Sequence, residues 1–80
     1  MARITLNSLL PGEHGIIERV DSAASSIRQR LLEMGLTKRT DIEIIRFAPM
    51  GDPIEISVRG YRLSLRRVEA ESVIVLKNSQ

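Results

Sequence analysis

The sequence predicts a mainly β protein: a small barrel of about five strands, with one short α-helix between the first strand and a long hairpin. Two observations predict this fold class. Five short runs are rich in β-branched residues or alternate in polarity, and turn residues bound each of them. Because a sheet of such short strands leaves unpaired edges, closure into a barrel is favoured. We expect residues 1–80 to form one domain, since the chain is too short for two.

The expected strands follow the polarity pattern along the chain. The first occupies residues 15–20, after the breaker pair Pro11–Gly12. A tight type II′ turn at Gly60–Tyr61 would place Val58 opposite Leu63. A single helical turn is expected just before the last strand. The remaining strands are expected at residues 41–47, 54–59, 61–66 and 73–76.

A helix is expected after the first strand. The polar cluster at residues 21–26 offers several N-caps, and Ser26 has the capping-box spacing to Gln29. Gly35 would end the helix in the left-handed conformation, with Leu36 folded back onto the last turn. The apolar face of this amphipathic helix consists of Ile27, Leu31 and Met34.

The strand at residues 41–47 has an irregular pattern. Ile42 and Ile44 share one face and Ile45 and Phe47 share the other, so a regular strand cannot bury all four against one core. One alternative is a β-bulge that switches the parity midway. The other is that Ile45 and Phe47 form an apolar patch for self-association or for a partner.

The stretch APMGDP, residues 48–53, is the predicted tip of the long hairpin. Its two prolines fix φ and favour extended backbone at the residues before them, which leaves Met50 and Gly51 as the bend. A phosphate cradle needs consecutive N–H groups, and a metal loop needs more oxygen ligands than Asp52 supplies. We therefore expect a stiff tip that presents Met50 to a partner.

Arginine dominates the basic residues, with ten of the twelve. Its planar fork suits carboxylates and phosphates. Arg59 and Arg62, on either side of Gly60, are expected to help steer association with an acidic partner surface. An arginine finger reaching into a partner's nucleotide site is a second interpretation, and simple solvated faces are a third.

His14 is the only histidine. With Glu13 or Glu18 it could contact a divalent cation, but a tight site needs three or four convergent ligands, so a solvated imidazole is expected. Met34 is interpreted as a core residue because it shares the apolar helix face. We assign no catalytic residue, no metal ligand and no cofactor.

Composition argues against several classes of protein. Phe47 and Tyr61 are the only aromatic residues and the net charge is +2, so no nucleic-acid partner is expected. The chain has no Ser/His/Asp set and no P-loop spacing, so we do not expect an enzyme. Neither a long apolar run nor a signal-peptide pattern is present, and with no cysteine the sequence indicates a cytoplasmic protein.

Three stretches, taken in their order and spacing, resemble the FeoA family of bacterial ferrous iron uptake. They are Leu31–Leu36 (LLEMGL), Ala48–Ile54 (APMGDPI) and Leu63–Ala70 (LSLRRVEA), the last leading into Val73–Val75. Lys38–Arg39 departs from the family, which often has Pro-Gly after the helix. This departure indicates either another turn type or a residue held at positive φ.

The resemblance implies an SH3-like barrel and a non-enzymatic accessory or regulatory protein of ferrous iron uptake. Its partner would be the cytosolic GTP-binding part of the FeoB transporter, so the chain would meet the membrane only through that transporter. Association with transition-metal binding is implied at the level of the family. The alternative is a small nucleic-acid-binding barrel, or a regulatory module like that of metal-dependent repressors. The candidate partner-binding residues are Ile45, Phe47, Met50, Gly51, Asp52, Arg59 and Arg62.

Overall fold

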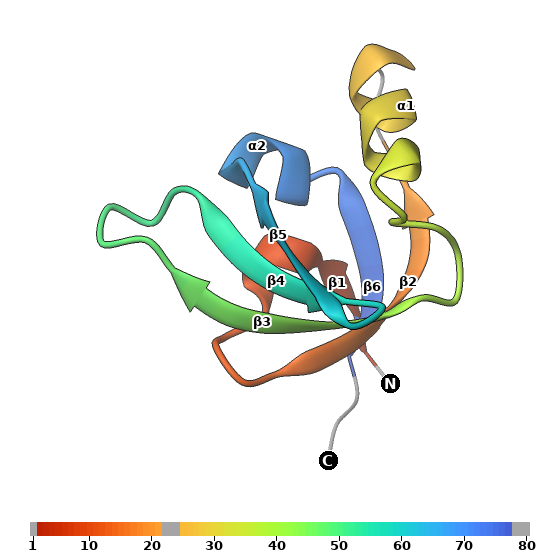
Figure 1. Ribbon diagram of the computed structural model, residues 1–80. Coiled ribbons are helices and arrows are strands. Elements are labelled where there is room, and N and C mark those ends of the chain that lie inside the picture. The colour runs from red at the N-terminus through yellow and green to blue at the C-terminus, as the bar shows by residue number, and fades with distance from the viewer. Residues whose placement is uncertain (1, 22–24, 78–80) are drawn as a thin grey trace.

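The computed structural model describes residues 2–21 and 25–77 of the chain. Figure 1 shows its strands curving around a common centre, with α1 standing out to one side and α2 lying at the end of β5. The elements are β1 (Ala2–Thr5), the 3₁₀ helix η1 (Leu6–Ser8), β2 (His14–Val20), α1 (Ser25–Glu33), β3 (Asp41–Phe47), β4 (Ile54–Val58), β5 (Tyr61–Leu65), α2 (Arg67–Ala70) and β6 (Val73–Lys77). The predicted mainly β fold is confirmed.

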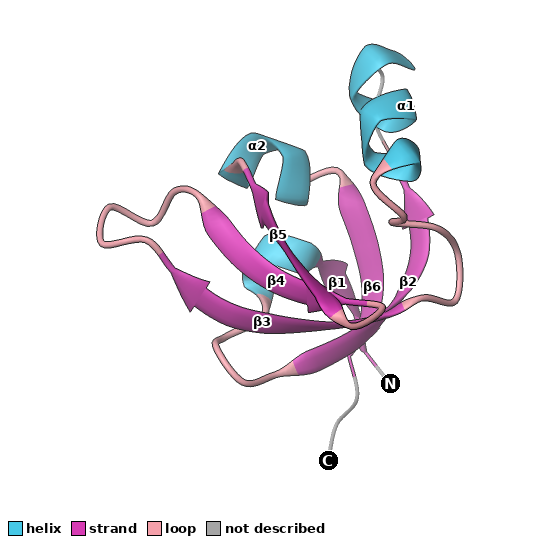
Figure 2. Ribbon diagram, viewed as in Figure 1, coloured by secondary structure: helices cyan, strands magenta, loops and turns pink. Residues whose placement is uncertain are grey.

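The described strands form one antiparallel sheet in the order β1-β6-β2-β3-β4-β5 (Figure 2). Five of them lie where the polarity pattern predicts strands, to within two residues. The sheet has one strand more than the about five expected, because β1 also joins it. Its four residues are too few to show alternation, and its partner β6 lies near the other end of the chain.

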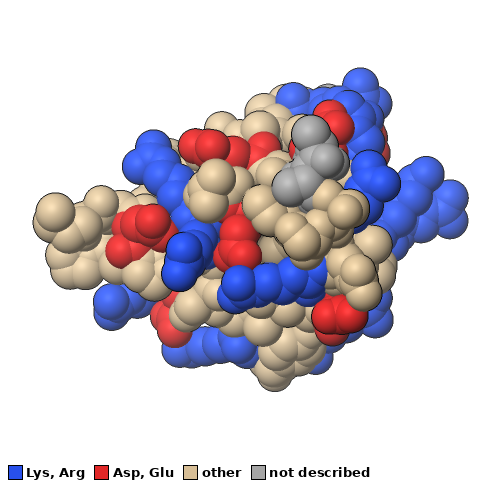
Figure 3. All heavy atoms as spheres, turned by 90° about the horizontal axis from the view of Figure 1, so that it is seen from above, with Lys and Arg blue, Asp and Glu red and all other residues tan. Residues whose placement is uncertain are grey.

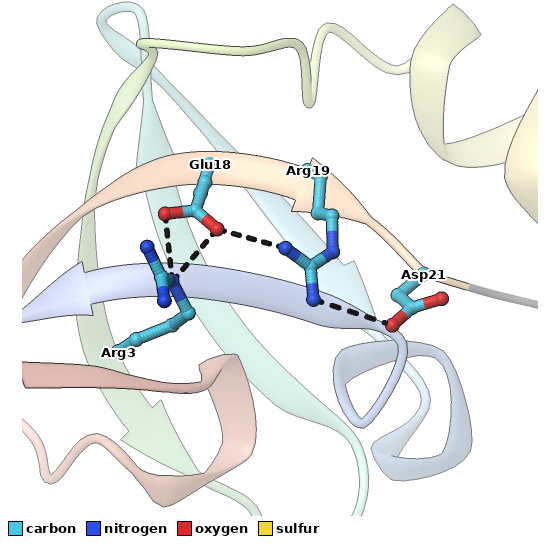
Figure 4. A network of polar contacts seen from close by, with 4 residues as sticks. All are labelled: Arg3, Glu18, Arg19 and Asp21. Atoms are coloured by element: carbon cyan, nitrogen blue, oxygen red, sulfur yellow. Dashed lines mark hydrogen bonds and ion pairs between the residues drawn. The ribbon is translucent and has the colours of Figure 1, made fainter.

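An ion-pair network joins β1 to β2 (Figure 4). Arg3 Nε lies 2.8 Å from the Glu18 carboxylate, and a guanidinium nitrogen of Arg19 lies 2.9 Å from the same group. Arg19 also approaches Asp21, at 3.6 Å. The pairing of β2 with β6 shifts register between Ile17 and Arg19, which makes Glu18 the bulged residue. The bulged residue therefore supplies the carboxylate that pairs with Arg3 of the edge strand β1.

The core lies inside the barrel, between the sheet, η1, α1 and α2. Alternate residues of β4 point inward, as the sequence pattern predicts. Leu6 and Leu9 enter from η1 and the residue after it, and Ala70 enters from α2. The largest fully buried side chains are Leu6, Leu9, Ile17, Leu31, Leu36, Ile42, Ile44, Ile54, Ile56, Val58, Leu65 and Val73.

Helix α1 ends as the sequence predicts. Gly35 has φ of +93°, its N–H bonds to the Leu32 carbonyl, and the Leu36 N–H bonds to the Leu31 carbonyl. This pair of bonds is the Schellman motif, and Leu36 is fully buried behind it. The predicted capping box at Ser26 is wrong, because Ser26 is already inside the helix, whose N-cap lies outside the described residues.

The irregular pattern in β3 is explained by a β-bulge. The pairing of β3 with β4 shifts between Ile44 and Arg46, so Ile45 is the extra residue. Ile44 is fully buried before the shift, and Phe47 packs against the core after it. The bulge alternative is therefore confirmed, and part of the Phe47 side chain is buried against the core.

The predicted turn between β4 and β5 is wrong. The two-residue loop is Arg59–Gly60, and Val58 pairs with Tyr61 instead of Leu63. Both loop residues have positive φ, +51° at Arg59 and +85° at Gly60, as a type I′ turn requires. The turn type could not be read from the sequence because an arginine rarely takes this conformation. The buried parity is unchanged, since the register moves by two residues.

A second arginine resolves the departure at Lys38–Arg39. Arg39 has φ of +71°, so the chain keeps the left-handed backbone without a glycine. Its N–H donates to the Ile17 carbonyl at 2.7 Å, which anchors the loop on β2. Of the two possibilities, the structure shows the residue held at positive φ.

Candidate interaction surface

The tip of the β3–β4 hairpin, residues 48–53, is closed by its own backbone. The Ala48 N–H bonds to the Pro53 carbonyl at 3.0 Å, and the Gly51 N–H bonds to the Ala48 carbonyl at 2.7 Å. Gly51 has φ of +85°, which a glycine takes without steric cost. Met50 is 91% exposed at the bend, as the sequence predicts. The loop thus holds one large apolar side chain in solvent on an ordered backbone.

Asp52 connects the tip to α2. Its Oδ1 accepts a hydrogen bond of 3.0 Å from the N–H of Arg67, the first residue of that short helix. An acceptor at this place satisfies a backbone donor that has no partner within the helix. Asp52 therefore has a structural role that the sequence did not indicate, because the contact joins segments 15 residues apart.

A small cavity of about 60 Å³ lies beneath the tip. Its lining residues are Asn7, Phe47, Gly51, Ile54 and Arg67. Within the described part of the chain, Asn7 Oδ1 is buried without a hydrogen-bond partner. A small cavity and a buried polar atom without a partner therefore lie beside the base of the tip.

The β4–β5 turn, Arg59–Gly60, is fastened to the loop after α1. A guanidinium nitrogen of Arg59 donates to the hydroxyl oxygens of Thr37, at 2.9 Å, and Thr40, at 3.0 Å. The Tyr61 hydroxyl donates to the Met34 carbonyl at the end of α1. These polar contacts tie a strand turn to a helix end, and neither the hydroxyl pair nor Tyr61 was identified from the sequence.

The candidate partner-binding residues do not form one cluster. Met50, Gly51 and Asp52 lie at one end of β4, and Arg59 and Arg62 lie around its other end. In Figure 1 the tip projects far from the β4–β5 turn. Two separate surfaces therefore carry the predicted contact residues, with Ile45 and Phe47 on the strand that leads to the tip.

The charges show no single basic face toward the viewer in Figure 3, where blue and red groups are interspersed. The left end of that view, which is the projecting tip, is mostly uncharged. Several arginines are already neutralised, as Arg30 is by Glu69 at 3.2 Å. The face drawn in Figure 3 therefore has no broad basic surface that would steer an acidic partner toward it.

His14 lies beside Asp41 and Glu43, and not beside Glu13 or Glu18 as the sequence suggested. Its ring nitrogens are 4.0 Å from Asp41 and 3.8 Å from Glu43. Glu13 instead binds Lys77 and the Leu10 N–H, and these two bonds hold the pKa of Glu13 below its ordinary value. Among residues 2–21 and 25–77, no three His, Cys, Asp or Glu side chains are placed to hold a metal ion.

An open groove of about 490 Å³ runs past His14 and the β4–β5 turn. Basic side chains line it together with acidic ones, among them Arg39, Arg59, Asp41 and Glu43. Such a mixed lining favours neither an acidic nor a basic ligand.

No described helix has the length and apolar character needed to cross a bilayer.

Comparison with known proteins gives a consistent family. A model described as the FeoA domain matches residues 4–77. A fusion protein of Fe(2+) transport protein A and Fe(2+) transporter FeoB from Porphyromonas gingivalis is 34% identical over 70 residues, which are 88% of this chain and 8% of that protein. The chain thus spans a small part of that relative's length.

Solved structures share the fold. A FeoA-like protein from Clostridium acetobutylicum has a TM-score of 0.90 and 34% identity, covering 100% of this chain and 92% of that one. A zinc-complexed FeoA from Stenotrophomonas maltophilia, described as an SH3 domain protein, has a TM-score of 0.79 and 31% identity, covering 90% and 88%.

A manganese-dependent transcriptional repressor also shares the architecture, with a TM-score of 0.89 over 98% of this chain and 42% of that one. At 13% identity this likeness shows the fold alone. The family match over 4–77 and the relatives above 30% identity show more: the chain belongs to the FeoA family and has its SH3-like barrel fold.

Proposed function

We propose that this FeoA-family protein is a non-enzymatic accessory of ferrous iron transport that binds the cytosolic GTP-binding part of a FeoB-type transporter. One observation carries the proposal. In the Porphyromonas gingivalis relative, a region similar to this chain is part of one polypeptide with transporter FeoB. Fusion holds two modules at high effective concentration, and the same pair as separate chains needs an affinity of its own. The protein would act at the cytoplasmic side of the transporter.

The tip of the β3–β4 hairpin is the proposed contact. Exposed large apolar side chains cost solvation free energy in the free protein, and a partner surface that covers Met50 recovers it. The backbone bonds within residues 48–53 order the loop before binding, so little conformational entropy is lost on association. Gly51 and Asp52 shape the tip, and Phe47 and Ile45 lie on the strand that leads to it. Arg59 and Arg62, at the other end of β4, would belong to a second contact.

The test is an association measurement with the soluble cytosolic domain of the cognate transporter. Tagged wild-type protein is mixed with that domain without nucleotide, with GDP and with a non-hydrolysable GTP analogue. We expect a complex in at least one nucleotide state. No complex in any of the three states would contradict the proposal. Labelled duplex and single-stranded nucleic acid, tested over a salt series in parallel, report the competing function through a steep fall of affinity with salt.

A further inference from the structure

Strand β5 ends the sheet, and its outer edge has no strand beside it among the described residues. A two-residue turn makes its closing pair, Val58 and Tyr61, exchange both backbone hydrogen bonds. Since bonded and non-bonded pairs alternate, Leu63 and Leu65 also bond to β4. Arg62 and Ser64 occupy the non-bonded positions. Their N–H and C=O groups therefore point away from β4, in the plane of the sheet and toward its open edge.

These outward groups remain open in the folded protein. Within the described residues, the backbone of neither Arg62 nor Ser64 bonds to a turn, a helix or a loop. Both residues are exposed. Strand β5 therefore presents four backbone hydrogen-bonding groups in the geometry that a further strand would meet.

Arginines surround this edge. Arg62 and Arg66 alternate with the core-facing residues, as Ser64 does, so their side chains share its face of the sheet. Arg59 lies in the turn that precedes β5. None of these three has a described carboxylate within 4.0 Å, whereas Arg3 beside the opposite edge, β1, is paired with Glu18. The two edges of the sheet thus differ, since positive charge is neutralised at β1 and left free at β5.

A second copy of the chain is a poor occupant of this edge. Two β5 strands paired antiparallel about Leu63 would make Arg62 and Arg66 of both copies diagonal neighbours on one face of the sheet. Like charges on adjacent strands destabilise the pairing. An edge of this kind repels itself and favours a segment with carboxylates.

We propose that the outer edge of β5 binds an extended acidic segment of a partner protein by strand addition. Backbone bonds to Arg62 and Ser64 would hold the segment, and Arg62 and Arg66 would select its carboxylates.

The decisive variant is Ser64→Pro, with Ser64→Ala as its matched control. Proline removes an N–H that points away from β4 and is tolerated at such an edge position, so the sheet is expected to persist. The probe is a blocked six-residue peptide of alternating Glu and Val, and a Lys/Val peptide serves as the charge control. Binding is followed in amide NMR spectra of the labelled protein, which also report whether each variant is folded.

We expect the acidic peptide to shift the Arg62 and Ser64 amide signals of the wild type and of Ser64→Ala and to slow exchange of these amides with deuterated solvent. Ser64→Pro should weaken the peptide's affinity at least 10-fold. The inference is overturned if the wild-type Arg62 and Ser64 amides are unaffected, if the Lys/Val peptide binds equally well, or if Ser64→Pro binds like Ser64→Ala. Should Ser64→Pro not fold, the wild-type exchange data and the charge control decide the question.

Discussion

The two turns at the ends of β4 differ in how they are attached to the rest of the molecule. The Arg59–Gly60 turn is built into the molecule, because Arg59 bonds to Thr37 and Thr40 and the neighbouring Tyr61 bonds to the end of α1. The tip at residues 48–53 is closed by its own backbone and touches the rest of the fold at its base, through Asp52. Residues of the kind that often bind a partner, such as arginines in an exposed turn, can thus be engaged in contacts within the fold. The side chain of Arg59 is therefore engaged within the fold, whereas the side chain of Met50 at the tip is left exposed.

Gly35→Ala should have the largest effect on stability. A Cβ at Gly35 would lie 2.8 Å from the Tyr61 hydroxyl, at a residue whose φ is +93°. We expect a loss of roughly 2 kcal/mol or more in the free energy of unfolding, from backbone strain together with the broken Tyr61 contact. Urea unfolding measures it.

Gly12→Ala is the matched control for that experiment. Gly12 has φ of +88° and nothing within 4 Å of the added Cβ, so only the backbone strain remains, about 1 kcal/mol. Equal losses in the two variants would show that the Tyr61 contact does not hold the β4–β5 turn to α1.

Arg59→Ala should destabilise the protein by about 1 to 1.5 kcal/mol. The variant loses two hydrogen bonds to hydroxyl oxygens, one of them on Thr40, which is 6% exposed. Arg62→Ala, three residues away and without such contacts among the described residues, should change stability by less than about 0.5 kcal/mol. Thermal unfolding of both variants makes the comparison, and identical midpoints would refute the structural role of Arg59.

Asp52→Ala should cost about 1 kcal/mol, because the Arg67 N–H at the start of α2 loses its acceptor. Asp52→Asn keeps an acceptor oxygen and should recover most of that loss. Amide exchange at Arg67 is the most local measurement. If that amide is equally protected in Asp52→Ala, the base of the tip does not depend on this bond.

Met50→Asp should have the smallest effect on the fold, within about 0.5 kcal/mol, because the side chain is 91% exposed. Phe47→Ser, a few residues earlier in the same hairpin, removes a ring that packs against the core and should be several times more costly. Denaturant unfolding of the two variants separates them. A similar loss in both would mean that the tip is packed more tightly than its exposure indicates.

Local signals in the sequence predicted much of this fold. Gly35 marked the end of α1, alternation located β4 and β5, and the parity conflict in β3 pointed to the bulge at Ile45. Each of these depends on a few neighbouring residues. The tip could be predicted as well, because its prolines and glycine restrict the backbone locally.

What the sequence could not predict depends on contacts between distant segments. Strand β1 is defined by its pairing with β6, and the side chain of Arg59 in the turn bonds to Thr37 and Thr40, about 20 residues earlier in the chain. No propensity favours an arginine at positive φ, so the type I′ turn and its register were missed. The hydrogen bond from Arg67 to Asp52 was missed because it joins two segments 15 residues apart.

We propose that the tip, and not the Arg59–Gly60 turn, makes the main contact with the transporter's cytosolic domain. A direct test of this contact is the affinity of that domain for Met50→Asp, compared with Leu32→Asp. Leu32 is another exposed apolar residue and belongs to α1, which Figure 1 shows at the opposite end of the molecule from the tip. We predict at least a 10-fold weaker affinity for Met50→Asp and an unchanged affinity for Leu32→Asp. Unchanged binding by Met50→Asp would contradict the account and reduce residues 48–53 to a turn.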